Sequence, residues 1–92
     1  MEFEWDEAKR RANVRKHGID FADVAQIFEN ELVVIEDERF DYGESRFVAF
    51  GLLLDEVVVV ACTMPNDDTV RVISVRKATT NETRNFFKHL SN

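Results

Sequence analysis

The stretch VRVISVRKATTNETR, residues 70–84, decides the fold, because it changes within a few residues from a strand pattern to a helix pattern. Its first half alternates as a β-strand does, with Val70, Val72 and Ser74 on one side and Arg71, Ile73 and Val75 on the other. Its second half contains TTNE at residues 79–82, the form of a helix capping box, in which a hydroxyl is followed three residues later by Glu. We therefore predict a strand over residues 69–76 and a helix over residues 80–90.

Cations gather where the predicted strand becomes the helix. Arg76 and Lys77 lie at the junction, and Arg84 follows about one turn into the helix. The free N–H groups and the dipole of a helix N-terminus favour anions, and Arg binds a phosphate with two N–H groups. The pattern predicts that these three side chains form a phosphate-sized pocket. The alternative is that they are solvated surface charges, as most Lys and Arg are.

Outward from this stretch, the chain predicts a single domain over residues 1–92 of the α+β class. Short connections between the strands indicate a curved antiparallel β-sheet of four to five strands, with two N-terminal helices and one C-terminal helix. Asp6 and Asp20 are the expected N-caps of helices over residues 6–17 and 21–29, and Ala8 and Ala12 are expected on the inner face of the first. Pro65 is expected to end a strand and to form a turn over residues 64–68.

Composition excludes several classes of protein. A chain of 92 residues with 45% hydrophobic residues is long enough for one core. Cys62 is the only cysteine, so an internal disulfide is excluded, and its apolar surroundings predict a small core residue. The sequence has no apolar run of membrane-spanning length and no signal-peptide pattern, so we expect no membrane contact and a cytoplasmic protein.

The net charge of −6 is unevenly distributed. Residues 1–17 carry +1, residues 18–69 carry −11, and residues 70–92 carry +4, which together give the total. This asymmetry predicts a local anion-binding face at the C-terminal end and an acidic face in the middle. The acidic stretch over residues 37–44 is either a solvated loop face or a surface for a basic partner helix.

Four separated motifs resemble the BrnT toxins of type II toxin–antitoxin pairs: FEWD at residues 3–6, KHGIDF at 16–21, DYGESR at 41–46 and RVISVRKAT at 71–79. The resemblance implies a RelE-like ribonuclease fold and RNA cleavage that inhibits translation and growth. It also implies a BrnA-like ribbon-helix-helix antitoxin as partner, with promoter DNA bound only through that antitoxin.

RNA cleavage without a metal needs a base for the 2′-hydroxyl, cations for the charge on phosphorus and an acid for the leaving oxygen. We predict Arg76, Lys77 and Arg84 at the phosphate, and His17 and Glu82 as proton-transfer groups. Alternatively, His17 only ends its helix and Glu82 only caps the last one. No group of side chains has metal-ligand spacing, so we predict neither a metal nor another cofactor.

Three further residues are expected to contact RNA: Arg46, Arg71 and Tyr42. Arg46 either faces the same groove as Arg76 or pairs with Glu44, and Tyr42, the only phenol, either contacts RNA or packs in its loop. The aromatic side chains Trp5, Phe86 and Phe87 are expected in the core before they are expected to stack on bases.

A second function stays open beside the ribonuclease. The chain has no Arg in the turn before its last strand, and Phe86 stands where the family tends to have Tyr. These two differences favour a catalytically weak or inactive toxin-fold module, which acts mainly in antitoxin binding and in regulation of its own promoter.

Overall fold

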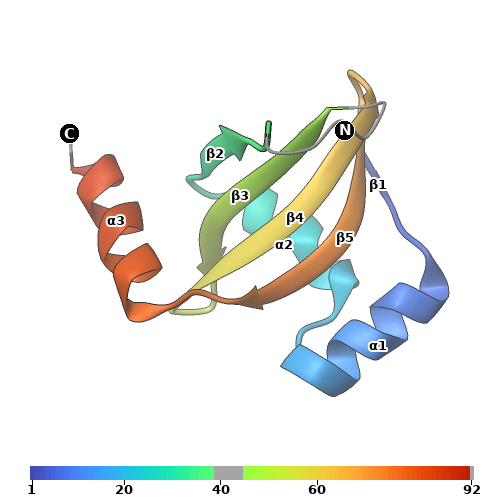
Figure 1. Ribbon diagram of the computed structural model, residues 1–92, viewed down its shortest axis with the longest axis horizontal. Coiled ribbons are helices and arrows are strands. Elements are labelled where there is room, and N and C mark those ends of the chain that lie inside the picture. Colours follow the sequence, from blue (N-terminus) through green and yellow to red (C-terminus); the bar gives the residue numbers. More distant parts are fainter. Residues whose placement is uncertain (39–44, 92) are drawn as a thin grey trace.

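The computed structural model describes residues 1–38 and 45–91, and these form one five-stranded sheet with helices around it (Figure 1). The strands lie in the order β1-β5-β4-β3-β2, with bounds β1 (Glu2–Glu4), β2 (Val33–Glu36), β3 (Arg46–Leu53), β4 (Glu56–Asn66) and β5 (Thr69–Lys77). The helical segments are α1 (Glu7–His17), a 3₁₀ turn η1 (Phe21–Asp23), α2 (Val24–Phe28) and α3 (Thr80–Leu90). The predicted α+β class and the five strands are confirmed. No helix in these described ranges is both long and apolar enough to cross a membrane.

The expected all-antiparallel sheet is wrong in one place, because β1 pairs with β5 in parallel. The other three pairings are antiparallel, as predicted. Short connections fix the direction only of strands that follow one another along the chain. β1 is separated from β5 by most of the sequence, so no short turn sets its direction. The second predicted helix also differs, because a 3₁₀ turn precedes an α2 of only five residues.

Pro65 does not end its strand, which corrects the predicted turn over residues 64–68. β4 continues to Asn66, and its register with β5 shifts between Thr63 and Asn66. A proline is tolerated at such a bulge, where it does not have to donate to the ladder. The turn itself is tighter, and the N–H of Asp68 donates to Oδ1 of Asn66 at 2.9 Å.

A second irregularity in β5 changes which side chains share a face. Ala61 pairs with Ser74 and Cys62 with Val72, so Ile73 is the extra residue of a β-bulge. The bulge brings Val75 to the buried face together with Val72. The predicted grouping of Val75 with Arg71 is therefore wrong, and Ser74 and Arg76 instead share the opposite face of the sheet.

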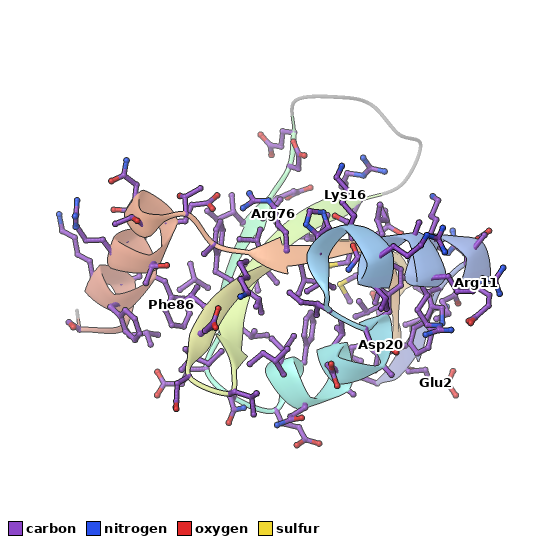
Figure 2. All side chains as sticks on the ribbon, turned by 90° about the horizontal axis from the view of Figure 1, so that it is seen from below. Glu2, Arg11, Lys16, Asp20, Arg76 and Phe86 are labelled. Carbon is purple, nitrogen blue, oxygen red and sulfur yellow. The ribbon has the colours of Figure 1, made fainter. Side chains whose placement is uncertain are left out.

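The main core lies between the sheet and the η1–α2 segment, which is behind the sheet in Figure 1. Gly51 of β3 allows the close approach, because a Cβ there would lie 2.7 Å from Cγ2 of Ile27 and 2.8 Å from Cδ2 of Leu32. The single Cys62 is buried in this core, as predicted. α1 and α3 lie at opposite ends of the molecule (Figures 1 and 2).

α1 docks through polar side chains rather than through alanines. Ala8 and Ala12 are exposed, so the predicted inner face is wrong, and Asn13 is the buried residue at 6% exposure. Its Nδ2 donates to the carbonyls of Ile19 and Val75, both at 2.9 Å, and its Oδ1 accepts from the N–H of Val75 at 3.1 Å. Asn13 thus takes the place of a neighbouring strand beyond the end of β1.

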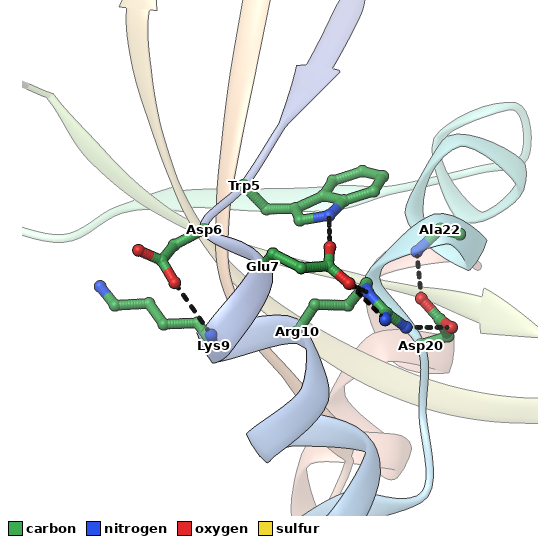
Figure 3. A network of polar contacts seen from close by, with 7 residues as sticks. All are labelled: Trp5, Asp6, Glu7, Lys9, Arg10, Asp20 and Ala22. Carbon is green, nitrogen blue, oxygen red and sulfur yellow. Dashed lines mark hydrogen bonds and ion pairs between the residues drawn. The ribbon is translucent and has the colours of Figure 1, made fainter.

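The N-terminal caps are formed as predicted. Figure 3 shows Asp6 accepting from the N–H of Lys9 and Asp20 accepting from the N–H of Ala22, at 3.1 and 2.9 Å. Arg10 joins the two elements, because it contacts Glu7 with one part of its guanidinium and Asp20 with another. Gly18 ends α1 with φ 71°, the left-handed conformation expected of this glycine.

The capping box of α3 is also confirmed, and it includes an ion pair to β5. Thr79 accepts from the N–H of Glu82, and Oε1 of Glu82 accepts from the N–H of Thr79 at 2.8 Å. The same carboxylate receives two N–H groups of Arg76, at 2.8 and 3.0 Å. The hydrogen bonds from Arg76 have the largest effect on the carboxyl group of Glu82, and the bond from the N–H of Thr79 adds to it. Together they lower the pKa of Glu82 from 4.5 to about 2.

Replacement of Asn13 tests whether α1 is held by this one amide. We expect Asn13→Ala to lower the free energy of unfolding by roughly 3 kcal/mol, because it leaves buried main-chain groups of Val75 and Ile19 without partners. Asn30→Ala is the matched control, since its amide makes only an exposed bond to the carbonyl of Gln26. Urea unfolding of both variants measures the difference. Equal losses would show that Asn13 is not the anchor.

The ion pair between Arg76 and Glu82 predicts a pH dependence of stability. Because folding lowers the pKa of Glu82, its contribution is complete above about pH 4.5 and is lost as the pH falls toward about 2. Arg76 is 41% exposed, which reduces the expected contribution to about 1 kcal/mol. Glu82→Gln keeps the cap and removes the charge, so its stability should fall less between about pH 6 and about pH 3.

The control for this titration is Glu56→Gln. It removes the carboxylate that pairs with Lys77, which is more exposed than the carboxylate of Glu82. It should leave the difference in unfolding free energy between the two pH values as in the unmodified chain. If the unfolding free energy of Glu82→Gln falls as much with pH as that of the unmodified chain, other carboxylates cause the acid sensitivity.

Candidate functional site

Arg76 is a cation held by several hydrogen bonds on the face of the sheet opposite the main core. Its guanidinium makes the bidentate contact with Glu82 and a further bond to the carbonyl of Lys77 at 3.2 Å. The hydrogen bond with Glu82 raises the pKa of Arg76, so the group stays charged. A guanidinium held on one side in this way presents its remaining N–H groups in a fixed direction.

Arg46 lies in the same depression as Arg76, as one of the two predicted alternatives requires. The depression has a volume of about 200 Å³, and Ser74, Ala61, Val48 and Val59 are among the residues that line it. Arg46 comes from the start of β3 and Arg76 from the end of β5, so β4 separates them across the sheet. The apolar side chains of Val48, Val59 and Ala61 form the floor of this depression. Its two cations come from different strands.

A second depression lies between the end of α1 and β5. Its volume is about 290 Å³, and its polar lining residues are Lys9, Asn13, Lys16, His17 and Ser74. Ser74 also lines the depression of Arg46 and Arg76, so the two hollows have this residue in common. Figure 2 shows Lys16 and Arg76 on the same side of the molecule. We call these two depressions together, defined by Lys16, His17, Ser74, Arg46 and Arg76, the β5 groove.

Acidic side chains border the β5 groove on its other side. A hollow of about 400 Å³ is lined by Arg76 together with Glu36, Asp37, Glu38 and Glu82. Asp37 also lines the depression of Arg46. The cations of the groove therefore face one acidic border, at the end of β2.

The structure does not form the predicted pocket of Arg76, Lys77 and Arg84. Lys77 contacts Glu56 at 3.4 Å, and as the neighbour of Arg76 in a strand it points to the opposite side. Arg84 contacts Asn81, and it lies two residues beyond Glu82, which places it on another face of α3.

The other predicted RNA contacts are dispersed. Arg71 pairs with Glu4 at 2.8 Å beside β1. Tyr42 lies outside the described residues, as does Glu44, the alternative partner of Arg46.

The aromatic predictions are confirmed for two residues and wrong for one. Trp5 packs edge to face against Phe21 with ring centres 6.3 Å apart, and Phe86 is buried. Phe87 is 46% exposed, because it lies one position beyond Phe86 and therefore turns away from the sheet.

Sequence reasoning missed the two residues that join the groove, Ser74 and Lys16. A strict two-residue alternation placed Ser74 on the face of Val70 and Val72, and only the bulge at Ile73 reverses it. Lys16 could have been found from its position beside His17 in the KHG motif, at the end of α1.

Burial raises the pKa of the Cys62 thiol to about 11, so this side chain is a core residue rather than a nucleophile. Within residues 1–38 and 45–91, no three His, Cys, Asp or Glu side chains are grouped closely enough to hold a metal ion.

Comparison with known proteins identifies the family. The family model of the ribonuclease toxin BrnT of type II toxin–antitoxin systems matches residues 5–82. The crystal structure of the Brucella abortus ribonuclease toxin BrnT is similar with a TM-score of 0.72 and 30% sequence identity, over 87% of this chain and 99% of that chain. A comparison with curated proteins found no match. The chain therefore belongs to the BrnT family of ribonuclease toxins of type II toxin–antitoxin systems.

Proposed function

We propose that this toxin, with a RelE-like fold, cleaves RNA without a metal ion and binds the scissile phosphate in the β5 groove. The observation that carries the proposal is the shared depression of Arg46 and Arg76, which has Ser74 in common with the depression that Lys16 and His17 line. Two guanidinium groups from different strands suit a phosphate, because a guanidinium is planar, stays charged and matches the geometry of phosphate oxygens. Cleavage of cellular RNA would inhibit translation and growth, and it would take place in the cytoplasm.

The proposed reaction is an attack of the 2′-hydroxyl on the neighbouring phosphorus. A base removes the hydroxyl proton, the new P–O bond forms, and the bond to the 5′-oxygen breaks as an acid protonates that oxygen. The products are a 2′,3′-cyclic phosphate and a free 5′-hydroxyl. Arg46 and Arg76 would stabilise the additional negative charge on the phosphorane.

Proton transfer is assigned to His17 rather than to Glu82. A carboxylate with a pKa of about 2 is a weak base and is almost never protonated at neutral pH. Glu82 is better suited to holding the guanidinium of Arg76 in place, as a positioning residue. The imidazole of His17 lines the groove next to Lys16, and histidine is the side chain that most often transfers protons in catalysis.

The remaining predicted contacts receive lesser roles. Lys77, Arg84 and Arg71 lie outside the β5 groove, so we propose that they contact flanking phosphates if the RNA extends that far. The contact of Tyr42 with RNA stays a prediction. The proposed partner is a BrnA-like ribbon-helix-helix antitoxin, and promoter DNA would be bound only through it.

The acidic border of the groove favours the alternative function. Glu36, Asp37 and Glu38 lie beside Arg76, and they would repel the phosphates of an RNA strand. If this repulsion dominates, the chain acts as a catalytically weak toxin-fold module, in antitoxin binding and promoter regulation.

Cleavage of a structured RNA in EDTA by the purified chain tests the ribonuclease. We expect Arg46→Ala and Arg76→Ala to lower the cleavage rate by about 100-fold each, since each removes a cation from the developing charge. Lys77→Ala and Arg84→Ala are the matched controls, because they remove the same charge outside the groove. They should lower the rate by no more than a few-fold. Cyclic-phosphate ends identify the reaction. Equal rates in all four variants would refute the β5 groove as the site, and no cleavage by the unmodified folded chain would favour the binding module.

His17→Ala tests the proton-transfer assignment separately. We expect a loss of about 100-fold, with partial recovery when imidazole is added, because a free imidazole can occupy the vacated space and carry the proton. A loss without recovery, together with a lowered unfolding free energy, would assign His17 to the end of α1 instead. His89→Ala, at the exposed end of α3, is the control.

A further inference from the structure

β2 is the outermost strand of the sheet and pairs on one side only within the described residues. The N–H of Asp37 donates to the carbonyl of Arg46 on β3, at 2.7 Å. Hydrogen-bonding directions alternate along an antiparallel strand. The main-chain N–H and C=O groups of Val34 and Glu36 therefore point outward, toward the free edge.

The centre of this edge is apolar on both faces of the sheet. Val34 is 52% exposed and Ile35 is 53% exposed, and they point to opposite faces. Beside Val34 lies an apolar hollow of about 310 Å³, lined by residues that include Phe28 and Phe47. Beside Ile35 lies a smaller hollow of about 130 Å³, next to Phe86. An additional strand would find an apolar recess for its side chains on each face.

The charge around β2 identifies the kind of strand that fits. Residues 29–38 carry five acidic side chains and no basic one: Glu29, Glu31, Glu36, Asp37 and Glu38. Two copies of this chain would bring two such acidic edges together, and like charges on neighbouring strands are destabilising. A basic segment from another protein would instead be attracted to this edge.

We propose that β2 binds an extended, basic segment of the antitoxin as a sixth strand of the sheet. The proposal rests on the membership of a toxin–antitoxin family, but not on the ribonuclease activity. Main-chain bonds to Val34 and Glu36 would supply affinity, and alternate apolar side chains would enter the two hollows. Basic side chains would meet the acids at both ends of the strand.

Protection of a free edge is the ordinary reason for charges on an outer strand. Protective charges interrupt the exposed strand itself. Here Glu29 and Glu31 precede the strand and Glu36 is its last residue, whereas its centre exposes Val34 and Ile35. An edge that is apolar at its centre and acidic at its ends is suited to selecting a partner rather than to excluding every strand.

The test compares Val34→Pro with Val34→Ala in binding the cognate antitoxin. Proline removes the outward N–H of residue 34 and blocks an added strand, but the ladder to β3 does not use that N–H. Alanine makes a similar loss of apolar surface and keeps the N–H. We expect Val34→Pro to raise the dissociation constant by roughly tenfold or more over Val34→Ala. Phe87→Ala, which removes exposed apolar surface on α3, should leave it unchanged.

A folding check and a second variant distinguish a lost contact from a misfolded protein. Circular dichroism confirms that each variant is folded, and Glu31→Gln with Glu36→Gln replaces Val34→Pro if that variant does not fold. This charge variant should also weaken binding, and its binding should depend less on salt. Antitoxin binding that is equal in the proline and alanine variants would overturn the proposal. So would self-association of the toxin that Val34→Pro abolishes. Because binding is measured without RNA, a failure of the ribonuclease assay leaves this test unaffected.

Discussion

The contact between Asn13 and the main chain of Val75 is the interaction on which the arrangement of this toxin depends. β1 pairs with β5 only as far as Arg71, and beyond that point β5 would expose unpaired main-chain groups. One buried amide satisfies both groups of Val75 and the carbonyl of Ile19. It therefore fixes α1 against β5 and, with it, the position of His17 beside Ser74. α1 has little apolar surface to bury. The hydrogen bonds of Asn13, rather than apolar packing, therefore hold this helix against the sheet.

The bulge at Ile73 has a comparable consequence for the chemistry. It keeps Val72 and Val75 in the core while Ser74 and Arg76 turn to the other face. Without the extra residue, one of these two pairs would be on the wrong side, because a slip of one residue exchanges the faces of a strand. Bulges commonly re-aim side chains next to functional sites. Here the bulge at Ile73 directs the guanidinium of Arg76 to the face where Glu82 contacts it.

Local signals in the sequence predicted much of the fold. The caps at Asp6, Asp20 and Thr79 and the glycine after α1 have short-range causes, and all of them are formed. The parallel pairing of β1, the bulge at Ile73 and the burial of Asn13 depend on residues far away in the sequence, so periodicity could not show them. The same limit applies to the site. A common groove for Arg46 and Arg76 was one of two alternatives, but proximity along the chain grouped Arg76 with Lys77, whereas the pleat of the strand separates these neighbours.

The acidic border and the β5 groove are not independent features. Glu36, Asp37 and Glu38 continue from β2 into the hollow that Arg76 and Glu82 line. A basic segment bound along β2 would therefore end next to Arg76, where it would neutralise the acids and cover the approach to the phosphate site. The negative charge that opposes RNA binding in the free toxin is then the charge that recruits its inhibitor. A toxin with a wholly basic surface would bind RNA more tightly, but it would lose this attraction for a basic antitoxin. If both proposals hold, the uneven charge of the chain would divide one face between substrate and partner.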